Sequence, residues 1–148
     1  MKSRDPRYQW LQGPAQVAAS QKQRLLSEGG GGYVPIPHAV YRTHLRDLIA
    51  KYDGKTARDA LTIYMYLHAY VNGTESNDWY MWAFPNVEQI REDTGIHGDR
   101  IAPLVRILES EGLIITKMIP WMGNAKKMYL PFYYPIMDDS RSREATES

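Results

Sequence analysis

The chain has 148 residues, 43% of them hydrophobic, and its 18 basic and 17 acidic residues give a net charge of +1. This length and apolar content fit a single domain with its own core. The absence of cysteine excludes a disulfide framework and a thiolate metal site. The sequence has neither an apolar signal core near its start nor the roughly 20 consecutive apolar residues that cross a bilayer, so we expect a cytoplasmic protein.

Charge is distributed unevenly along the chain. Residues 1–58 carry ten Lys or Arg and four Asp or Glu, whereas residues 86–133 carry six of each kind. Positive charge for a nucleic-acid backbone is therefore expected mainly from the N-terminal part.

Residues 1–32 are predicted to form a flexible basic arm, because Gln, Ser and Gly are frequent and Gly29 to Gly32 is a linker by composition. Within the arm, residues 14–28 can form a helix, although their apolar stripe is poor. The arm either reaches phosphates or acidic protein through its basic side chains, or is a solvated tail.

Two helices are predicted after the arm. Pro35 and Pro37 favour an extended entry, and residues 38–52 then form a helix with Tyr41, Leu45, Leu48, Ile49 and Tyr52 on its apolar side. Residues 57–71 form the next helix, with Thr56 and Asp59 as a near capping box. Two apolar faces predict that this helix lies at the domain centre, with the far face covered by the 38–52 helix or by a second subunit. One face carries Leu61, Tyr64, Leu67 and Val71, and the other carries Ile63, Tyr66 and Tyr70.

Residues 79–84 form an aromatic run that we predict to be the first strand of a small sheet. Aromatic side chains can stack on unpaired bases, but we favour a packing role for Trp82 and Phe84.

Residues 85–115 predict two short helices, a tight turn and the start of a strand. Asn86 is a good N-cap, Thr94-Gly95 ends the first helix, and Ile96 fills the turn. The second helix, about residues 99–111, has one apolar face and stops at Gly112. That face consists of Ile101, Leu104, Val105 and Leu108.

Strands are predicted at 113–119 and 127–134, joined by a loop that carries the turn signal Gly123-Asn124. Residues 135–148 are predicted to be a disordered, charged tail. The expected fold class is α+β, mostly α.

Residues 33–134 resemble the winged helix-turn-helix domains of bacterial, phage and plasmid DNA-binding proteins, including replication initiators, replisome organisers and small transcription regulators. The resemblance is carried mainly by the Pro85 to Gly95 helix, the Thr94-Gly95-Ile96 turn and the ending LESEGLI at 108–114. It implies a winged helix-turn-helix with an N-terminal helical extension and a small antiparallel β wing.

In such a domain the second helix enters the major groove, and the wing, residues 120–127, contacts the DNA backbone. Proline has no backbone N–H, so Pro103 would leave a helical hydrogen bond unmade if the helix began at His97 or Gly98. We therefore predict a helix start at Asp99 or Arg100, with Asp99 as the N-cap. His97 either donates to a phosphate or caps the turn, and Arg100 and Arg106 are the best groove or phosphate contacts. The candidate DNA-binding residues are His97, Asp99, Arg100, Arg106, Asn124, Lys126 and Lys127.

Other chemistries find little support in the sequence. The four histidines share no metal-ligand spacing, the Gly29 to Gly32 run lacks the strand and Lys-Ser/Thr of a phosphate loop, and no nucleophile–base pair stands out. We therefore expect no enzyme activity, no metal and no cofactor.

Two functions remain open. The first is a double-stranded DNA-binding, nucleoid-associated transcription regulator or replication accessory, and the second is a winged-helix module for protein assembly with little specific DNA readout. Because the 57–71 helix and the arm leave apolar surface to cover, we expect a homodimer built from the N-terminal helices, with a replication or transcription protein as a further partner.

Overall fold

The computed structural model describes residues 5–28 and 32–136, in two compact units, Met1–Pro35 and Ile36–Ser148. The boundary thus falls three residues after the predicted one. Most of the linker glycines and most of the predicted tail lie outside the described residues. Pro135 and Ile136, however, belong to the folded unit, because the Ile136 amide donates to the Gly112 carbonyl at 2.9 Å.

The N-terminal unit is helical. A 3-10 helix, Pro6–Leu11, leads into α1, Gln12–Glu28, so helical structure begins earlier than the 14–28 segment that the sequence predicts. Asp5 starts the 3-10 helix by accepting the Arg7 amide hydrogen at 2.9 Å. Pro14 lies in the first turn of α1, where its missing N–H costs nothing. None of the residues 5–27 is buried.

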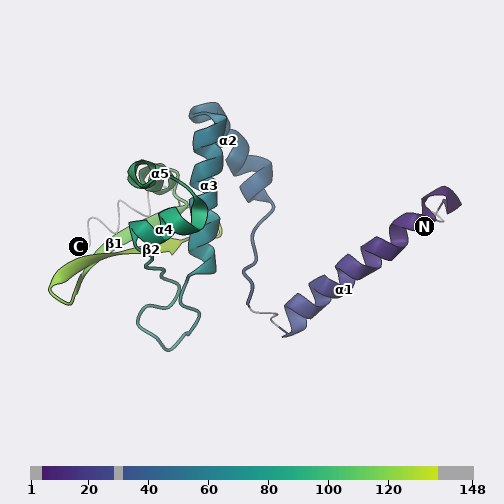
Figure 1. The fold of residues 1–148 in the computed structure, drawn as a ribbon, viewed down its shortest axis with the longest axis horizontal. Helices are drawn as coiled ribbons and strands as arrows, with labels where there is room; N and C mark the ends of the chain where they lie inside the picture. Colours follow the sequence, from purple (N-terminus) through teal and green to yellow (C-terminus); the bar gives the residue numbers. More distant parts are fainter. Residues whose placement is uncertain (1–4, 29–31, 137–148) are drawn as a thin grey trace. The chain divides into compact units, whose positions relative to one another are not determined.

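The second unit is α+β and mostly helical, as the sequence predicts, and its arrangement is compatible with a winged-helix-like fold (Figure 1). Its elements are a π-helical turn at Val40–His44, α2 at Leu45–Lys51, α3 at Gly54–Ala69, α4 at Val87–Thr94, α5 at Gly98–Ser110, β1 at Ile114–Trp121 and β2 at Asn124–Pro131.

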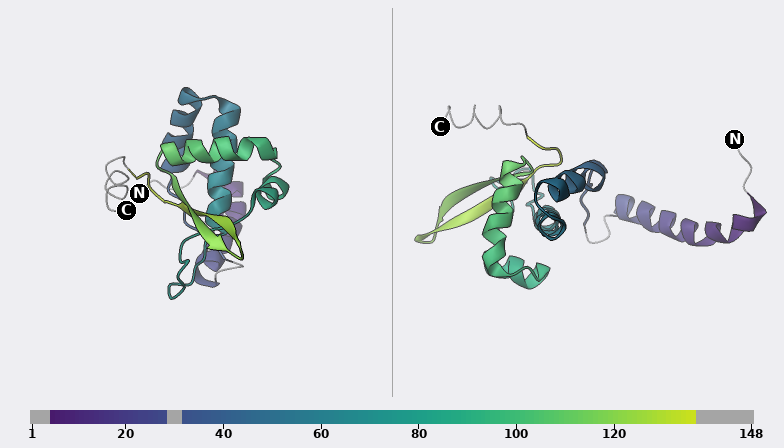
Figure 2. Two further views of the ribbon diagram at one scale, coloured as in Figure 1. Left: turned by 90° about the vertical axis from the view of Figure 1, so that its left-hand side faces the viewer. Right: turned by 90° about the horizontal axis from the view of Figure 1, so that it is seen from above.

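Helix α3 is the centre of this unit. It contacts α2, α4, α5 and β2, and Figure 2 shows α5 running across it. Tyr64 on one face and Ile63 on the other are fully buried, which confirms the prediction of burial on two sides. The Tyr66 hydroxyl donates to the Asp93 carboxylate at 2.7 Å. Part of the second face is therefore covered by α4 of the same chain, although Tyr70 stays exposed.

The N-terminal ends of α2 and α3 differ from the predictions. The cap of α3 is Asp53, whose Oδ1 accepts the Thr56 amide hydrogen at 2.7 Å, because the helix begins at Gly54, three residues earlier than expected. In the 38–52 segment Leu48 is buried and Leu45 is half-buried, whereas Tyr41, Ile49 and Tyr52 are exposed. The wider π-helical turn, in which the Leu45 amide donates to the Val40 carbonyl, changes the helical register and buries Val40 instead.

The predicted two-helix motif is confirmed in its main points. Asn86 caps α4 by accepting the Gln89 amide hydrogen at 2.7 Å, and Gly95 ends that helix at φ 74°. Ile96 is buried in the turn. The four predicted apolar positions of α5 are all buried, namely Ile101, Leu104, Val105 and Leu108.

Strands β1 and β2 form an antiparallel hairpin that projects from the helices (Figures 1 and 2). Their pairing runs from Ile114–Pro131 to Trp121–Asn124, so the strands extend further than predicted and the loop is only Met122-Gly123. Both loop residues have left-handed φ, 49° and 83°, as a two-residue hairpin turn matched to the strand twist requires. The predicted turn residue Asn124 is thus the first residue of β2.

The prediction of a strand over residues 79–84 is wrong, because the segment forms only two isolated bridges, Tyr80 with Asn72 and Ala83 with Tyr129 of β2. Ala83 exchanges two hydrogen bonds with Tyr129 of β2, at 2.8 and 2.7 Å. Upstream, the Met81 amide donates to the Asn72 carbonyl, and Met81 itself has φ 70°. This left-handed residue bends the chain, so the aromatic run cannot stay extended.

Candidate nucleic-acid interface

The start of α5 differs from the prediction that Asp99 is the N-cap. The helix begins at Gly98, and His97 is the cap, with its Nδ1 accepting the Asp99 amide hydrogen at 3.2 Å. Of the two roles considered for His97, the structure places it in the capping one, although its side chain remains exposed. Pro103 consequently lies inside the helix. It is exposed, so water can replace the missing hydrogen bond.

Arg100 points back into the protein. Its guanidinium donates to the carboxylate of Asp59 on α3, and the two side chains are only 33% and 25% exposed. This ion pair fastens the first turn of α5 to the central helix. No local pattern in the sequence indicates Asp59 in this role, because the two partners are separated by 41 positions.

Arg106 lies on the solvent-facing side of α5. It is exposed, and it makes no hydrogen bond or ion pair with any residue in 5–28 or 32–136. Its exposed neighbours one turn away are Ala102, Pro103 and Ser110, which carry no charge, while Glu109 is half-buried. The free guanidinium makes Arg106 the basic group of α5 that can reach an external anion.

Acidic side chains dominate the rest of the two-helix motif. Residues 86–111 contain six Asp or Glu and three Lys or Arg. Of the three, Arg100 is held by Asp59, and Arg91 is held by Glu88 in an ion pair one turn away. This pairing keeps the pKa of Glu88 below its ordinary value. The motif by itself therefore repels rather than attracts a phosphate backbone.

The hairpin has the opposite charge. Residues 112–131 contain Lys117, Lys126 and Lys127 and no acidic residue. Pairing of Met118 with Lys127 and of Lys117 with Met128 places Lys117 and Lys127 on opposite faces of the ribbon. Lys126, Lys127 and Asn124 are among the residues predicted from the sequence. Lys117 is not, although the alternation of side chains along β1 indicates that it is exposed.

Lys126 is held between two aromatic rings. Its Nζ lies 5.1 Å from the Phe84 ring centroid and 5.8 Å from that of Trp121. These rings, with Trp79, Ile119 and Met128, line a hollow of about 70 Å³. Phe84 contacts this hollow but remains 40% exposed, and Trp82 is half-buried, so the predicted packing role of the two rings is met only in part.

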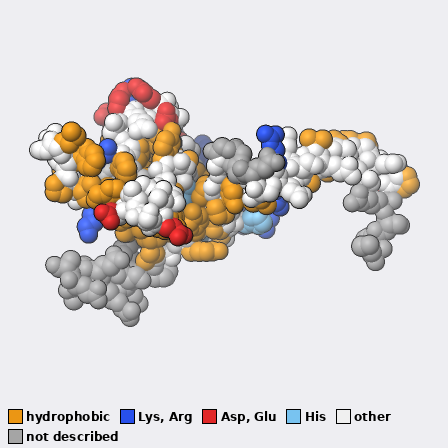
Figure 3. All heavy atoms as spheres, turned by 90° about the horizontal axis from the view of Figure 1, so that it is seen from below, with side chains coloured by type: hydrophobic (Ala, Val, Ile, Leu, Met, Phe, Trp, Pro, Cys, Tyr) orange, Lys and Arg blue, Asp and Glu red, His pale blue; other side chains and the backbone are white. Residues whose placement is uncertain are grey.

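The surface carries no continuous basic patch on the face drawn in Figure 3, where Lys and Arg side chains stand as separate spots among hydrophobic ones. Large exposed apolar residues of the second unit include Phe84, Met118, Trp121 and Met122. Three of these lie on the hairpin.

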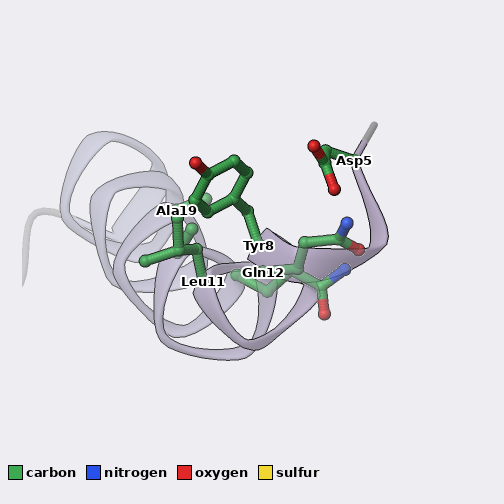
Figure 4. A pocket seen from close by; sticks show the side chains of 7 residues that line it. Asp5, Tyr8, Leu11, Gln12 and Ala19 are labelled. Carbon is green, nitrogen blue, oxygen red and sulfur yellow. The ribbon is translucent and has the colours of Figure 1, made fainter. Parts of the chain in front are cut away.

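A larger hollow, of about 490 Å³, runs along the N-terminal helices (Figure 4). Small side chains at Ala15 and Ala19 leave space beside Tyr8 and Leu11, and Asp5 lies at its N-terminal end. The hollow is formed by one helical segment alone. It is therefore an exposed groove of the arm and not an enclosed binding site.

A buried polar group lies at the C-terminal end of α3. His68 is 2% exposed, its Nε2 lies 3.1 Å from the Phe132 carbonyl oxygen, and its Nδ1 has no hydrogen-bond partner. The Tyr64 hydroxyl donates to the same carbonyl. Burial lowers the pKa of His68 and raises the pKa of Tyr64 to about 12. Both groups tie the end of the hairpin to α3 and are too enclosed to meet a ligand.

Comparison with known proteins yields no assignment: the chain matches no family model, and no curated protein or solved structure is significantly similar to it. Within residues 5–28 and 32–136, no three His, Asp or Glu side chains are grouped so that they can hold a metal ion. None of the described helices is long and apolar enough to cross a membrane.

Proposed function

We propose that this chain is a winged-helix protein that binds double-stranded DNA, as a transcription regulator or replication accessory of the bacterial, phage or plasmid type. The observation that carries the proposal is the charge of the hairpin, three lysines and no acidic residue, next to a two-helix motif whose second helix presents the unpaired Arg106. The order α3, Ala83, α4, α5, β1, β2, with Ala83 pairing to β2, supports the winged-helix assignment.

In this proposal the hairpin supplies most of the phosphate contacts. Lys117 and Lys127 lie on its two faces. Lys117 is exposed, whereas Lys127 is half-buried with its ammonium group 5.7 Å from the Tyr129 ring centroid. Each cation that displaces a condensed counterion from DNA adds to affinity at low salt. Helix α5 enters the major groove with Arg106, whose fork of donors suits guanine or phosphate. Asp99 and His97 lie at the N-terminal end of α5 and, in the proposed complex, close to the DNA backbone. Their capping hydrogen bond orients the start of α5, and they do not read bases. A nucleoid-associated location follows from this function.

A second candidate, a winged-helix module for protein assembly, is favoured by one specific observation. The surface of α4 carries Glu88, Glu92 and Asp93, against the single Arg91, which is already paired with Glu88. Such an acidic surface suits a basic protein partner better than a phosphate backbone. In a replisome or repressor complex the two candidates can act together, with α4 meeting protein and the hairpin meeting DNA.

Titration of the full chain with random and selected duplexes at two salt concentrations tests the proposal. If the protein reads the DNA sequence, one duplex sequence should be preferred over the others. That preference should persist when high salt screens the phosphate contacts. Equal, fully salt-sensitive binding to all duplexes would favour the assembly module. No binding at low salt would contradict DNA binding altogether.

A further inference from the structure

The tip of the hairpin is apolar although it is the part of the second unit that projects furthest from the helices in Figure 1. Met118 is 57% exposed, Trp121 49% and Met122 90%. A methionine side chain that is 90% exposed at the end of the hairpin makes almost no contact with the described residues. Its apolar side chain is therefore available to a partner.

The backbone conformation of Met122 is unusual for a residue with a large side chain. Its φ of 49° lies in the left-handed region, where a side chain is disfavoured and where glycine or asparagine is the usual residue of such a turn. The adjoining position, Gly123, follows the usual preference. A strained conformation that keeps a large apolar side chain at the apex is a reason to look for a use of that side chain.

The tip is also supported from behind. Trp121 and Phe84 enclose the Lys126 ammonium group, and Phe84 lies just before α4. Trp121 pairs with Asn124 directly below the turn. Cross-strand pairing and the contact of Lys126 with Phe84, just before α4, therefore fix the position of the turn relative to the second unit.

Charge decides which partner fits the tip. Met118 shares a face with Lys127, four cross-strand pairs below the turn, and Lys117 lies on the other face, five pairs below it. Cations therefore stand behind the apolar apex on both faces of the ribbon, and no acidic residue lies between 112 and 131. A minor groove has a phosphate strand on each wall, and proteins that enter it insert Met, Leu, Ile, Phe or Pro between base steps. An apolar wedge flanked by lysines matches that arrangement.

We propose that Met122 is a wedge that enters the minor groove of duplex DNA, partly unstacks one base step and bends the duplex, with Lys117 and Lys127 on the flanking phosphates. This inference rests on the proposed DNA binding and adds to it a deformation of the DNA. It predicts a preference for easily unstacked pyrimidine–purine steps under the wing, without a base contact there.

The test compares the full chain with two variants on duplexes that carry 2-aminopurine at a central TA step, or a fluorophore pair at the two ends. Met122→Gly removes the wedge and relieves the left-handed φ, so the turn stays intact. Met118→Ala is the matched control, because it shortens a second exposed methionine of the same hairpin away from the apex. Thermal unfolding verifies that both variants fold.

We expect the wild type and Met118→Ala to raise the 2-aminopurine emission and to shorten the end-to-end distance, with a kink within the range of about 20–90° known for wedge residues. Met122→Gly should bind with an unchanged salt dependence, because the lysines remain, but should lose both signals. Wild-type binding without unstacking or bending would overturn the wedge and leave the DNA-binding proposal standing.

Two other outcomes are also decisive. Absence of duplex binding by the wild type at low salt would overturn the proposed function itself, and the wedge with it. Binding to anionic phosphatidylglycerol vesicles that Met122→Gly loses, while it still bends DNA like the wild type, would reassign the apex to a lipid surface and overturn the wedge.

Discussion

Arg100 of α5 and Asp59 of α3 form an ion pair in which both side chains are mostly covered. The pair joins the helix expected to read DNA to the central helix of the fold. Because the guanidinium donates inward, its first role is to fix the position of α5. The second arginine of α5, Arg106, is left to face the solvent.

Replacement of either arginine should therefore have different effects. Arg100→Ala leaves the Asp59 carboxylate without its partner, so we expect a loss of about 1–3 kcal/mol in the free energy of unfolding, measured by denaturant titration. The double variant Asp59→Ala/Arg100→Ala should recover part of this loss, because no unpaired charge remains. Additive losses in the cycle would contradict a direct coupling of the two residues.

Arg106→Ala should remain as stable as the wild type, because the side chain is exposed and without a partner among the described residues. If Arg106 reads a base, the variant should lose about 1–3 kcal/mol of binding free energy for the selected duplex and relax the preference at one position. Fluorescence anisotropy with matched duplexes measures both effects. Arg46→Ala, an exposed arginine on α2, serves as the control and should bind normally. If the wild type, Arg106→Ala and Arg46→Ala bind the selected duplex with equal affinity, Arg106 does not contact DNA and the placement of α5 in the major groove is wrong.

The acid sensitivity of the fold should depend on His68. Burial keeps the pKa of this imidazole below the value of about 6.5 that it has in an unfolded chain. Between these two pKa values the unfolded state binds more protons than the folded state does. The contribution of His68 to the free energy of unfolding is therefore fully present above about pH 6.5 and is lost as the pH falls toward the folded pKa. The unpartnered Nδ1 explains the direction, because a proton added there finds no acceptor.

Chemical denaturation of the wild type and of His68→Phe at pH 7.5, 6.5 and 5.5 measures this contribution. The phenylalanine preserves a ring beside Tyr133, and Tyr64 still donates to the Phe132 carbonyl. We expect the variant to lose less stability between pH 6.5 and 5.5 than the wild type does. His38→Gln, at an exposed position, should follow the wild type; parallel curves for all three proteins would exclude His68 as the cause.

Removal of residues 1–32 should leave the thermal unfolding of the second unit nearly unchanged, because the chain divides into separate compact units at Pro35. The salt dependence of duplex binding should become weaker, since the arm contributes basic residues. A large fall in the melting temperature would mean that the arm packs on the domain, and an identical salt slope would mean that it makes no phosphate contact.

The homodimer remains a prediction, but its basis has changed. Ile63 and Tyr66 are covered within the chain, whereas the arm exposes Tyr8, Trp10, Leu11, Val17 and Leu26. Light scattering at micromolar concentration should report twice 17.1 kDa for the full chain and a monomer after removal of residues 1–32. A full-length monomer, with and without DNA, would exclude the dimer.

Local signals account for what the sequence predicted well. Asn86 caps α4 with its own side chain, Gly95 and Gly112 supply left-handed backbone, and the apolar face of α5 follows from helical spacing alone. Features that depend on distant partners escaped prediction. The Asp59–Arg100 pair joins two helices, and the predicted strand at 79–84 failed because Asn72 binds the backbone at Met81. At His97 an imidazole took the capping role that carboxylates more often fill.

Within the candidate site, the sequence indicated Arg106 and the two lysines of β2 but not their surroundings. Helical periodicity places Arg106 outside, whereas the enclosure of Lys126 by Phe84 and Trp121 requires the loop before α4 to fold back on the hairpin. The apex at Met122 was missed because turn preferences point to Gly123-Asn124, one residue later.

The salt dependence of duplex binding by the double variant Lys117→Gln/Lys127→Gln tests the central claim most directly. The two lysines lie on opposite faces of the hairpin. Each phosphate contact contributes about 0.9 to the slope of log K against log salt. We predict that the variant folds as the wild type does, binds more weakly at low salt, and has a slope smaller by roughly 2. A wild type that binds no duplex at low salt, or a variant with the wild-type slope, would contradict it.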